Sequence, residues 1–201
     1  MKTSQFMAAV CGGLLISITI GCSSPQKDGS TGQGTDTVSE TMGDTTAAGA
    51  GGAHADISNT QPDTTGNGTA DFVQKPNGEV ELVLNITFPK KANQSVAVHL
   101  HEHGACGDGG KEAHGHWNPT NEPHGKWGSG SFHSGDIGNI ELDANGKGTV
   151  TLSSNRWSIG GDEKTNILNR AIIVHSGVDD YKTQPTGNAG SRIGCGVIMS
   201  K

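Results

Sequence analysis

Residues 95–106 read SVAVHLHEHGAC, and large aliphatic side chains alternate in this stretch with alanine and histidine. Successive side chains of a β-strand point to opposite faces, so the alternation predicts a strand with one apolar face. His99 and His101 share the other face, close enough together to reach one metal ion, although such a pair taken alone is also typical of a polar strand face. The apolar face carries Val96, Val98 and Leu100.

The segments around this strand have the same short period, and no stretch shows a sustained helical period. Glycine fills 32 of the 201 positions, and each would cost about 1 kcal/mol inside a helix relative to alanine. Turn residues predict two hairpins, at Pro76-Asn77-Gly78 and at Asp143-Ala144-Asn145-Gly146. Further strands are predicted at residues 69–74, 79–88, 137–142, 149–152, 170–175 and 192–199. The chain is therefore predicted to be all-β, as an antiparallel sandwich or flattened barrel.

Two long stretches interrupt the predicted strands, at residues 103–135 and 176–191. Connections of this length without secondary structure are usually functional, so we expect these two loops to carry the function. The chain has a formal charge of −6. This charge argues against a nucleic-acid binder, because such proteins need a basic face to meet the phosphates.

Nine histidines are present, and most of them lie in or beside these two loops. Four candidate metal ligands follow one another at spacings of eight, nine and three residues: His116, His124, His133 and Asp136. Three imidazoles and one carboxylate suit tetrahedral Zn²⁺. His175 ends a predicted strand at the edge of the second loop. Together with His99 and His101, these residues are predicted to form a metal-binding constellation.

The chain begins with the pattern of an export signal. Lys2 supplies a short positive region, and residues 6–20 form an apolar run that is too short to span a bilayer comfortably. The run ends in TIGC, which resembles a bacterial lipoprotein signal and predicts lipidation of Cys22. We expect residues 1–21 to be a lipoprotein-type signal peptide, residues 22–54 a flexible linker rich in Gly, Ser and Thr, and residues 55–201 the folded domain. The alternative is an ordinary secretory peptide with an incidental Cys22.

Export would place the protein in the periplasm or cell envelope, with contact to a membrane only through the N-terminal lipid. Cys11 leaves with the signal peptide and Cys22 is the predicted lipidation site. Cys106 and Cys195 then remain as one pair in an oxidising compartment. We expect a disulfide between them, and two separate thiols are the alternative.

Five segments of the chain resemble the copper/zinc superoxide dismutase family. They are VHLHEHGAC at 98–106, HWNP at 116–119, HSGDIGN at 133–139, IIVHS at 172–176 and TGNAGSRIGCGVI at 186–198. The similarity covers residues 55–201, and the order of the motifs and the loop spacings agree together. The resemblance implies a Greek-key β-sandwich or flattened β-barrel with two long functional loops.

The resemblance also implies a role for each candidate residue. The copper ligands would be His99, His101, His116 and His175. The zinc ligands would be His116, His124, His133 and Asp136, so that His116 bridges one copper and one zinc ion per chain. Asp179 would link a copper-binding histidine to a zinc-binding histidine, and Cys106 and Cys195 would form the family disulfide.

The implied reaction is the dismutation of superoxide to oxygen and hydrogen peroxide, by copper that alternates between Cu(II) and Cu(I). His116 and Arg192 would be the catalytic residues. His116 would leave the reduced copper and bind a proton, and Arg192 would attract and hydrogen-bond the substrate anion. Zinc is redox-inert and would hold the bridging imidazole. The expected role is antioxidant defence outside the cytoplasm, with superoxide as the small-molecule substrate and the choice between monomer and homodimer left open.

Two other classes of function stay open on the sequence alone. One is a non-enzymatic relative that binds metal only for structure. Such a relative would lack a copper ligand or the arginine, and this sequence keeps both. The other is a copper-buffering lipoprotein to which His54, His103 and His114 contribute, since the resemblance assigns these three no role. A buffer would bind more than two ions per chain, whereas the enzyme would bind one copper and one zinc.

Overall fold

The computed structural model describes residues 51–201 of the chain. The predicted signal peptide, the lipidation site Cys22 and most of the predicted linker therefore lie outside the described residues. Within the described residues, no helix is long and apolar enough to cross a membrane.

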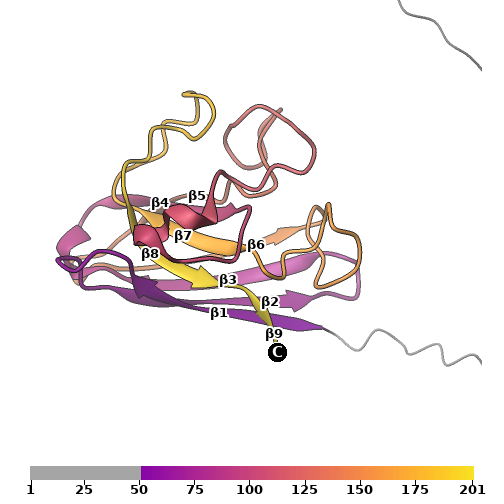
Figure 1. Cartoon of the computed structure of the whole chain (residues 1–201), viewed down its shortest axis with the longest axis horizontal. Coiled ribbons are helices and arrows are strands. Elements are labelled where there is room, and N and C mark those ends of the chain that lie inside the picture. The colour runs from indigo at the N-terminus through magenta and orange to yellow at the C-terminus, as the bar shows by residue number, and fades with distance from the viewer. Residues whose placement is uncertain (1–50) are drawn as a thin grey trace, which may run out of the picture. The chain divides into compact units, whose positions relative to one another are not determined.

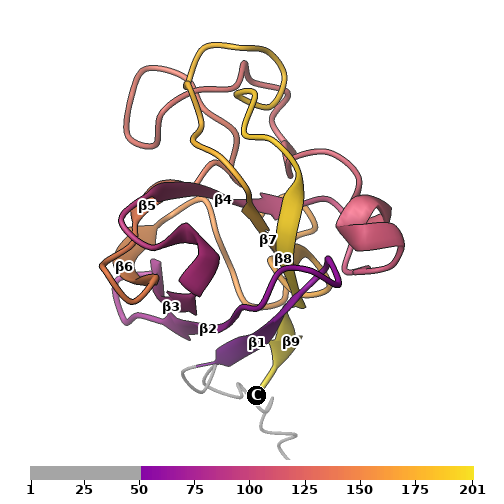
Figure 2. The same cartoon turned by 90° about the vertical axis from the view of Figure 1, so that its left-hand side faces the viewer.

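The described residues form one antiparallel sheet that curls into a flattened, nearly closed barrel (Figures 1 and 2). The strands are β1 (Gly52–Asn59), β2 (Asn67–Gln74), β3 (Val80–Thr87), β4 (Ser95–His101), β5 (Gly138–Glu141), β6 (Lys147–Ser154), β7 (Ala171–His175), β8 (Arg192–Val197) and β9 (Met199–Ser200). Two short 3-10 helices complete the structure, η1 (Pro89–Lys91) and η2 (Asp108–Ala113). The strand order is β5-β4-β7-β8-β1-β2-β3-β6, with β9 beside β1. The predicted all-β class and flattened barrel are confirmed.

The first predicted hairpin is confirmed. Strands β2 and β3 pair along their whole length, and Gln74 lies opposite Val80. Gly78 closes the turn by donating its backbone N–H to the Lys75 carbonyl at 3.0 Å, with a φ of +87°. A positive φ at this place is the reason that the turn needs glycine.

The second predicted hairpin is wrong in its pairing. The turn at residues 143–146 forms, because Gly146 donates its N–H to the carbonyl of Asp143. The strands on its two sides pair with different neighbours, β5 with β4 and β6 with β3. These two strands are the ends of the strand order. The turn therefore connects the two margins of the curled sheet and nearly closes the barrel.

Strand β1 is an addition to the predicted strands. It begins at Gly52, three residues before the expected boundary at 55, and His54 is part of it. Its inward side chains are mostly small, since Ala53 and Ala55 are buried there beside Ile57. Glycine and alanine give little of the β-branched or aromatic signal by which strands are recognised, so this strand resembled a continuation of the linker.

Strand β4 has the two faces that its alternation predicted. Val96, Val98 and Leu100 are fully buried in the core between the two sides of the barrel. His99 and His101 on the other face are also buried, with exposed fractions of 0% and 1%. A face that points away from the core is buried only if something covers it, and here the long loops lie over this strand.

The two predicted long loops rise from the same side of the barrel, as both views show (Figures 1 and 2). The first connects β4 to β5 and contains η2, and the second connects β7 to β8. A third long connection, residues 155–170 between β6 and β7, was not singled out from the sequence. It sends Trp157 and Ile167 into the core, so it is a packed part of the barrel.

A disulfide joins the first long loop to strand β8. Cys106 and Cys195 are bonded, which confirms the pairing expected from the sequence. Next to the bond, Ala113 at the end of η2 packs against Ile173 and Cys195. The disulfide and this small apolar cluster anchor the start of the loop to the barrel.

We expect that removing this disulfide lowers the free energy of unfolding by about 4–5 kcal/mol. The bond joins residues 89 positions apart, and closing a loop of about this length in the unfolded chain accounts for a value of that size. Thermal and denaturant unfolding with and without reductant would measure the effect. A variant with serine at both positions is the control, because reductant should not destabilise it further. Two free thiols found by alkylation and mass spectrometry in the exported protein would contradict the bond.

Candidate metal centre

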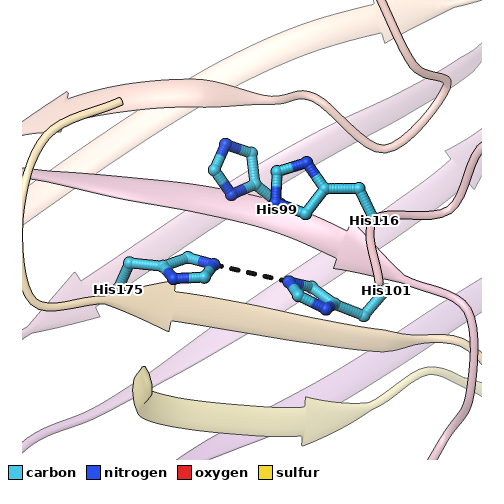
Figure 3. A group of neighbouring side chains, drawn as sticks. All are labelled: His99, His101, His116 and His175. Atoms are coloured by element: carbon cyan, nitrogen blue, oxygen red, sulfur yellow. Dashed lines mark hydrogen bonds between the residues drawn. The ribbon is translucent and has the colours of Figure 1, made fainter. Parts of the chain in front are cut away.

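Four histidines from three parts of the fold converge on one buried point. His99 and His101 come from β4, and His175 is the last residue of β7. His116 comes from the first long loop, where it forms an isolated β-bridge with His101. One ring nitrogen from each of the four lies within 4.8 Å of the other three (Figure 3).

The orientation of each ring in this group is set by a hydrogen bond on its far side. His99 Nε2 donates to Asp179 Oδ2 at 2.9 Å, and His101 Nδ1 donates to the backbone carbonyl of His114 at 2.9 Å. His175 Nδ1 lies 3.5 Å from the carbonyl of Gly190. The remaining nitrogens therefore face one another, with 3.4 Å between the Nε2 atoms of His101 and His175 (Figure 3).

A second group surrounds the carboxylate of Asp136, which is completely buried. Three imidazole nitrogens approach this carboxylate: His116 Nδ1 at 2.8 Å, His124 Nδ1 at 2.9 Å and His133 Nδ1 at 3.2 Å. The backbone N–H groups of Gly125 and His133 also donate to its Oδ2 atom. Three imidazoles and one carboxylate thus converge on a point that water does not reach.

His116 belongs to both groups. Its Nδ1 faces Asp136, and its Nε2 is buried without a hydrogen-bond partner on the side of the first group. Its ring lies 3.9 Å from the ring of His99, centroid to centroid. One imidazole therefore offers a nitrogen to each of two adjacent sites.

Asp179 connects the two groups from behind. Its Oδ2 accepts from His99 Nε2 and its Oδ1 from His124 Nε2, both at 2.9 Å. Asn139 holds the backbone of this aspartate with two hydrogen bonds. Its Oδ1 accepts from the Asp179 N–H, and its Nδ2 donates to the Asp179 carbonyl. At Gly187, a Cβ atom would lie 1.9 Å from Asp179 Oδ1, so only glycine fits against this bridge.

The first group is held in the neutral form. Burial lowers the pKa of His101 and of His175 well below the usual value, and the neighbouring histidines and Arg192 lower both further. Burial also lowers the pKa of His116 to about 4, even though Asp136 favours its protonation. Neutral imidazoles keep a lone pair on one ring nitrogen, and this lone pair is what a metal ion requires.

The second group contains an ionised carboxylate. Burial disfavours the ionised form of Asp136, but its close contacts with the three histidine rings and the backbone N–H of His133 outweigh burial and hold its pKa far below the usual range. The pKa of Asp179 is lowered for the same reason, by His124 and His99. Burial disfavours the cationic form of His124, yet its contacts with the two carboxylates raise its pKa to about 9. Both carboxylates are therefore anionic and attract positive charge.

Both groups have the donor sets and the unsatisfied atoms of metal sites. Four buried ring nitrogens have no hydrogen-bond partner, His99 Nδ1, His116 Nε2, His124 Nδ1 and His133 Nδ1. Buried polar atoms are almost always paired, because an unmade hydrogen bond is costly. Four imidazole nitrogens suit copper, and three imidazoles with one carboxylate suit zinc. A cation at each point would satisfy every one of these atoms.

Arg192 lies beside the first group at the start of β8, where it pairs with His175. Its Nη1 donates to the carbonyl of Gly110 and its Nη2 to the carbonyl of His114. The His114 carbonyl is the same acceptor that orients His101. The guanidinium is half-buried, and its charge contributes to the low pKa of both His101 and His175.

The structure brings together every metal-site residue named from the sequence, and it adds supports that sequence reasoning missed. Gln184 spans the two loops, because its Oε1 accepts from the His124 N–H and its Nε2 donates to the His124 carbonyl. Asn139 and the carbonyl of His114 were also missed. A backbone carbonyl has no sequence signal, and polar residues in a loop look alike until their partners are known.

The model of the copper/zinc superoxide dismutase family matches residues 66–198. Superoxide dismutase [Cu-Zn] 2 of Aquifex aeolicus is 37% identical over 151 residues, which cover 73% of this chain and 85% of the relative. An extracellular superoxide dismutase [Cu-Zn] of Caenorhabditis elegans is 36% identical over 137 residues, which cover 65% of this chain and 60% of the relative. The crystal structure of a double mutant of a SOD-like protein from Bacillus subtilis aligns with a TM-score of 0.65 at 30% identity, over 75% of this chain and 99% of that one. The barrel, the paired histidine groups and these similarities agree, and the chain belongs to the copper/zinc superoxide dismutase family.

Proposed function

We propose that this superoxide dismutase divides its two metals between the two buried groups. Copper is held by His99, His101, His116 and His175. Zinc is held by His116, His124, His133 and Asp136. The observation that carries the assignment is the double role of His116, whose Nε2 faces one group and whose Nδ1 faces the other.

The reaction converts two superoxide anions and two protons into one O₂ and one H₂O₂. Bound copper supplies the one-electron chemistry by alternating between Cu(II) and Cu(I). The chain supplies a proton carrier at His116 Nε2, the atom with no hydrogen-bond partner in the protein. Its Nδ1 lies beside Asp136 and would be held by the zinc that both residues bind, so the ring stays in place while Nε2 takes up or gives back a proton.

Arg192 is proposed to bind the substrate anion. Its positive charge lies next to His101 and His175, two of the histidines assigned to copper. The overall charge of the chain is −6, so it does not attract an anion as a whole. A local positive potential beside the reacting centre overcomes this repulsion at short range.

The location of the enzyme is a further part of the proposal. The disulfide and the similarity to an extracellular nematode enzyme are consistent with export. Residues 1–21 are proposed to direct this export, and Cys22 to carry the lipid that anchors the chain to a membrane. The choice between monomer and homodimer stays open.

Exchanging His116 for alanine is expected to reduce both copper and zinc content, whereas His124→Ala should reduce mainly zinc. Only His116 offers a nitrogen to both groups. Metal analysis of the purified variants by mass spectrometry measures both contents, and circular dichroism controls for folding. Equal losses of copper and zinc in the two variants would contradict the shared ligand.

Arg192→Ala is expected to keep both metals and to lose on the order of tenfold or more in rate, the scale of electrostatic steering. Arg192→Lys should lose less, because it keeps the charge without the planar donor fork. Salt separates steering from structural damage, since the screening length falls from about 10 Å at 0.1 M to about 3 Å at 1 M. The wild-type rate should fall as salt rises, and the alanine variant should respond less. A fully metallated alanine variant with wild-type rate and salt slope would exclude this role.

The anchor is tested at the mature N-terminus. Mass spectrometry of the membrane fraction should find a lipidated Cys22 as the first residue, and Cys22→Ser should abolish the modification. An exported, soluble wild-type protein whose Cys22 carries no lipid would support the ordinary secretory peptide instead.

A further inference from the structure

A third group of metal-ligating side chains lies outside both buried sites. Glu102, His103 and His114 each offer one ligand atom, and these atoms lie within 4.8 Å of one another. The rings of His103 and His114 are 4.5 Å apart, centroid to centroid, and nearly perpendicular. Both histidines are exposed and Glu102 is half-buried, so the group faces solvent.

The backbone holds the three side chains side by side. Strand β4 ends at His101, and the chain returns past it with His116 opposite His101 in a β-bridge. Beyond the bridge, the Glu102 N–H donates to the Gly115 carbonyl at 3.1 Å, and the His103 N–H donates to the Ala113 carbonyl at 3.2 Å. These two bonds keep the segments in contact beyond the bridge. The position of His103 beside His114 therefore follows from the fold and does not depend on a chance meeting of two mobile side chains.

His114 is fixed more firmly than an ordinary surface histidine. Its φ is +62°, a conformation that L-residues rarely adopt, and its carbonyl accepts hydrogen bonds from both His101 and Arg192. Unfavourable backbone conformations persist where the surroundings impose them, and they are common at ligand sites. The disulfide at Cys106 anchors the other side of the same loop.

The three side chains have no other task in the described part of the chain. Among residues 51–201, none of them makes a side-chain hydrogen bond or an ion pair, apart from the ring contact of the two histidines. Two imidazoles and one carboxylate are ligands of Cu²⁺ and Zn²⁺, whereas Ca²⁺ and Mg²⁺ prefer oxygen alone. The general order of divalent-metal affinities places Cu²⁺ above Zn²⁺ for such a set.

We propose that Glu102, His103 and His114 form a third metal site, which binds Cu²⁺ in preference to Zn²⁺ at the surface. The site shares no side chain with either buried group. Water completes its coordination because the histidines are exposed, so it binds more weakly and exchanges faster than a buried site. Its ligand Glu102 directly follows the proposed copper ligand His101 in the chain, so the site adds a copper-binding capacity close to the buried copper site.

The test adds Cu²⁺ to the full-length protein that already contains its resident copper and zinc. Equilibrium dialysis against Cu²⁺ buffered by a weak chelator, with metal analysis of the protein, counts the additional ions. We expect one additional Cu²⁺ per chain, with a Cu²⁺ electron paramagnetic resonance signal typical of nitrogen and oxygen ligands. In His103→Gln the affinity for this ion should fall by at least about tenfold. Removing a residue that only hydrogen-bonds to a metal ligand already lowers metal affinity by about that factor, and His103 is itself a proposed ligand.

His54→Gln is the matched control, because His54 lies on β1 and bonds to Asp71. It should bind the additional ion as the wild type does, and the superoxide dismutase activity of His103→Gln should be unchanged. Absence of an additional ion in the wild type, or equal binding by wild type and His103→Gln, would overturn the proposal. Either result leaves the assignment of the buried groups untouched, because their metals are present and counted at the start.

Discussion

The placement of six imidazoles and two carboxylates out of reach of water is the constraint on which the rest of this structure depends. Every ring has two nitrogens, and both need a partner when the ring is buried. The protein satisfies one nitrogen of most rings with its own atoms, such as Asp179, Asp136 or the His114 carbonyl. The nitrogens that are left converge on two points, and a cation at each point meets their need. Metal binding therefore satisfies the polar atoms that folding of the loops buries.

The barrel supplies the rigid floor for this arrangement, and the loops supply the cover. Strand β4 packs its apolar side chains into the core and turns His99 and His101 toward the loops. The disulfide fastens the first loop to β8, and Arg192 bonds to two carbonyls of the same loop. Gln184 then ties the second loop to His124. Arg192 and His101 share the His114 carbonyl, and Asp179 joins His99 to His124, so the arginine and the histidines of both groups are positioned together.

Burial separates the two metal groups of the enzyme from the third group on the surface. The buried groups are closed, oriented by hydrogen bonds on their far sides and suited to metals that stay bound. Glu102, His103 and His114 have the same kinds of donor atoms, but solvent reaches them. The same chemistry thus serves permanent cofactors inside the protein and an exchangeable ion outside it. The contrast comes from the backbone pairing beyond His101, which brings His103 to the surface one residue after the half-buried Glu102.

Sequence alone was sufficient for features that are encoded locally. The alternation around His99, the Asn-Gly turn at Gly78 and the isolated pair Cys106 and Cys195 predicted the strand, the hairpin and the bond that the structure contains. Tertiary structure decided which strands pair across the barrel, so the turn at residues 143–146 joins two margins of the sheet where a hairpin was expected. It also decided that β1 is a strand, and that Asn139 and the His114 carbonyl support the site. These features depend on contacts between segments far apart in the chain, and no local pattern of side chains records them.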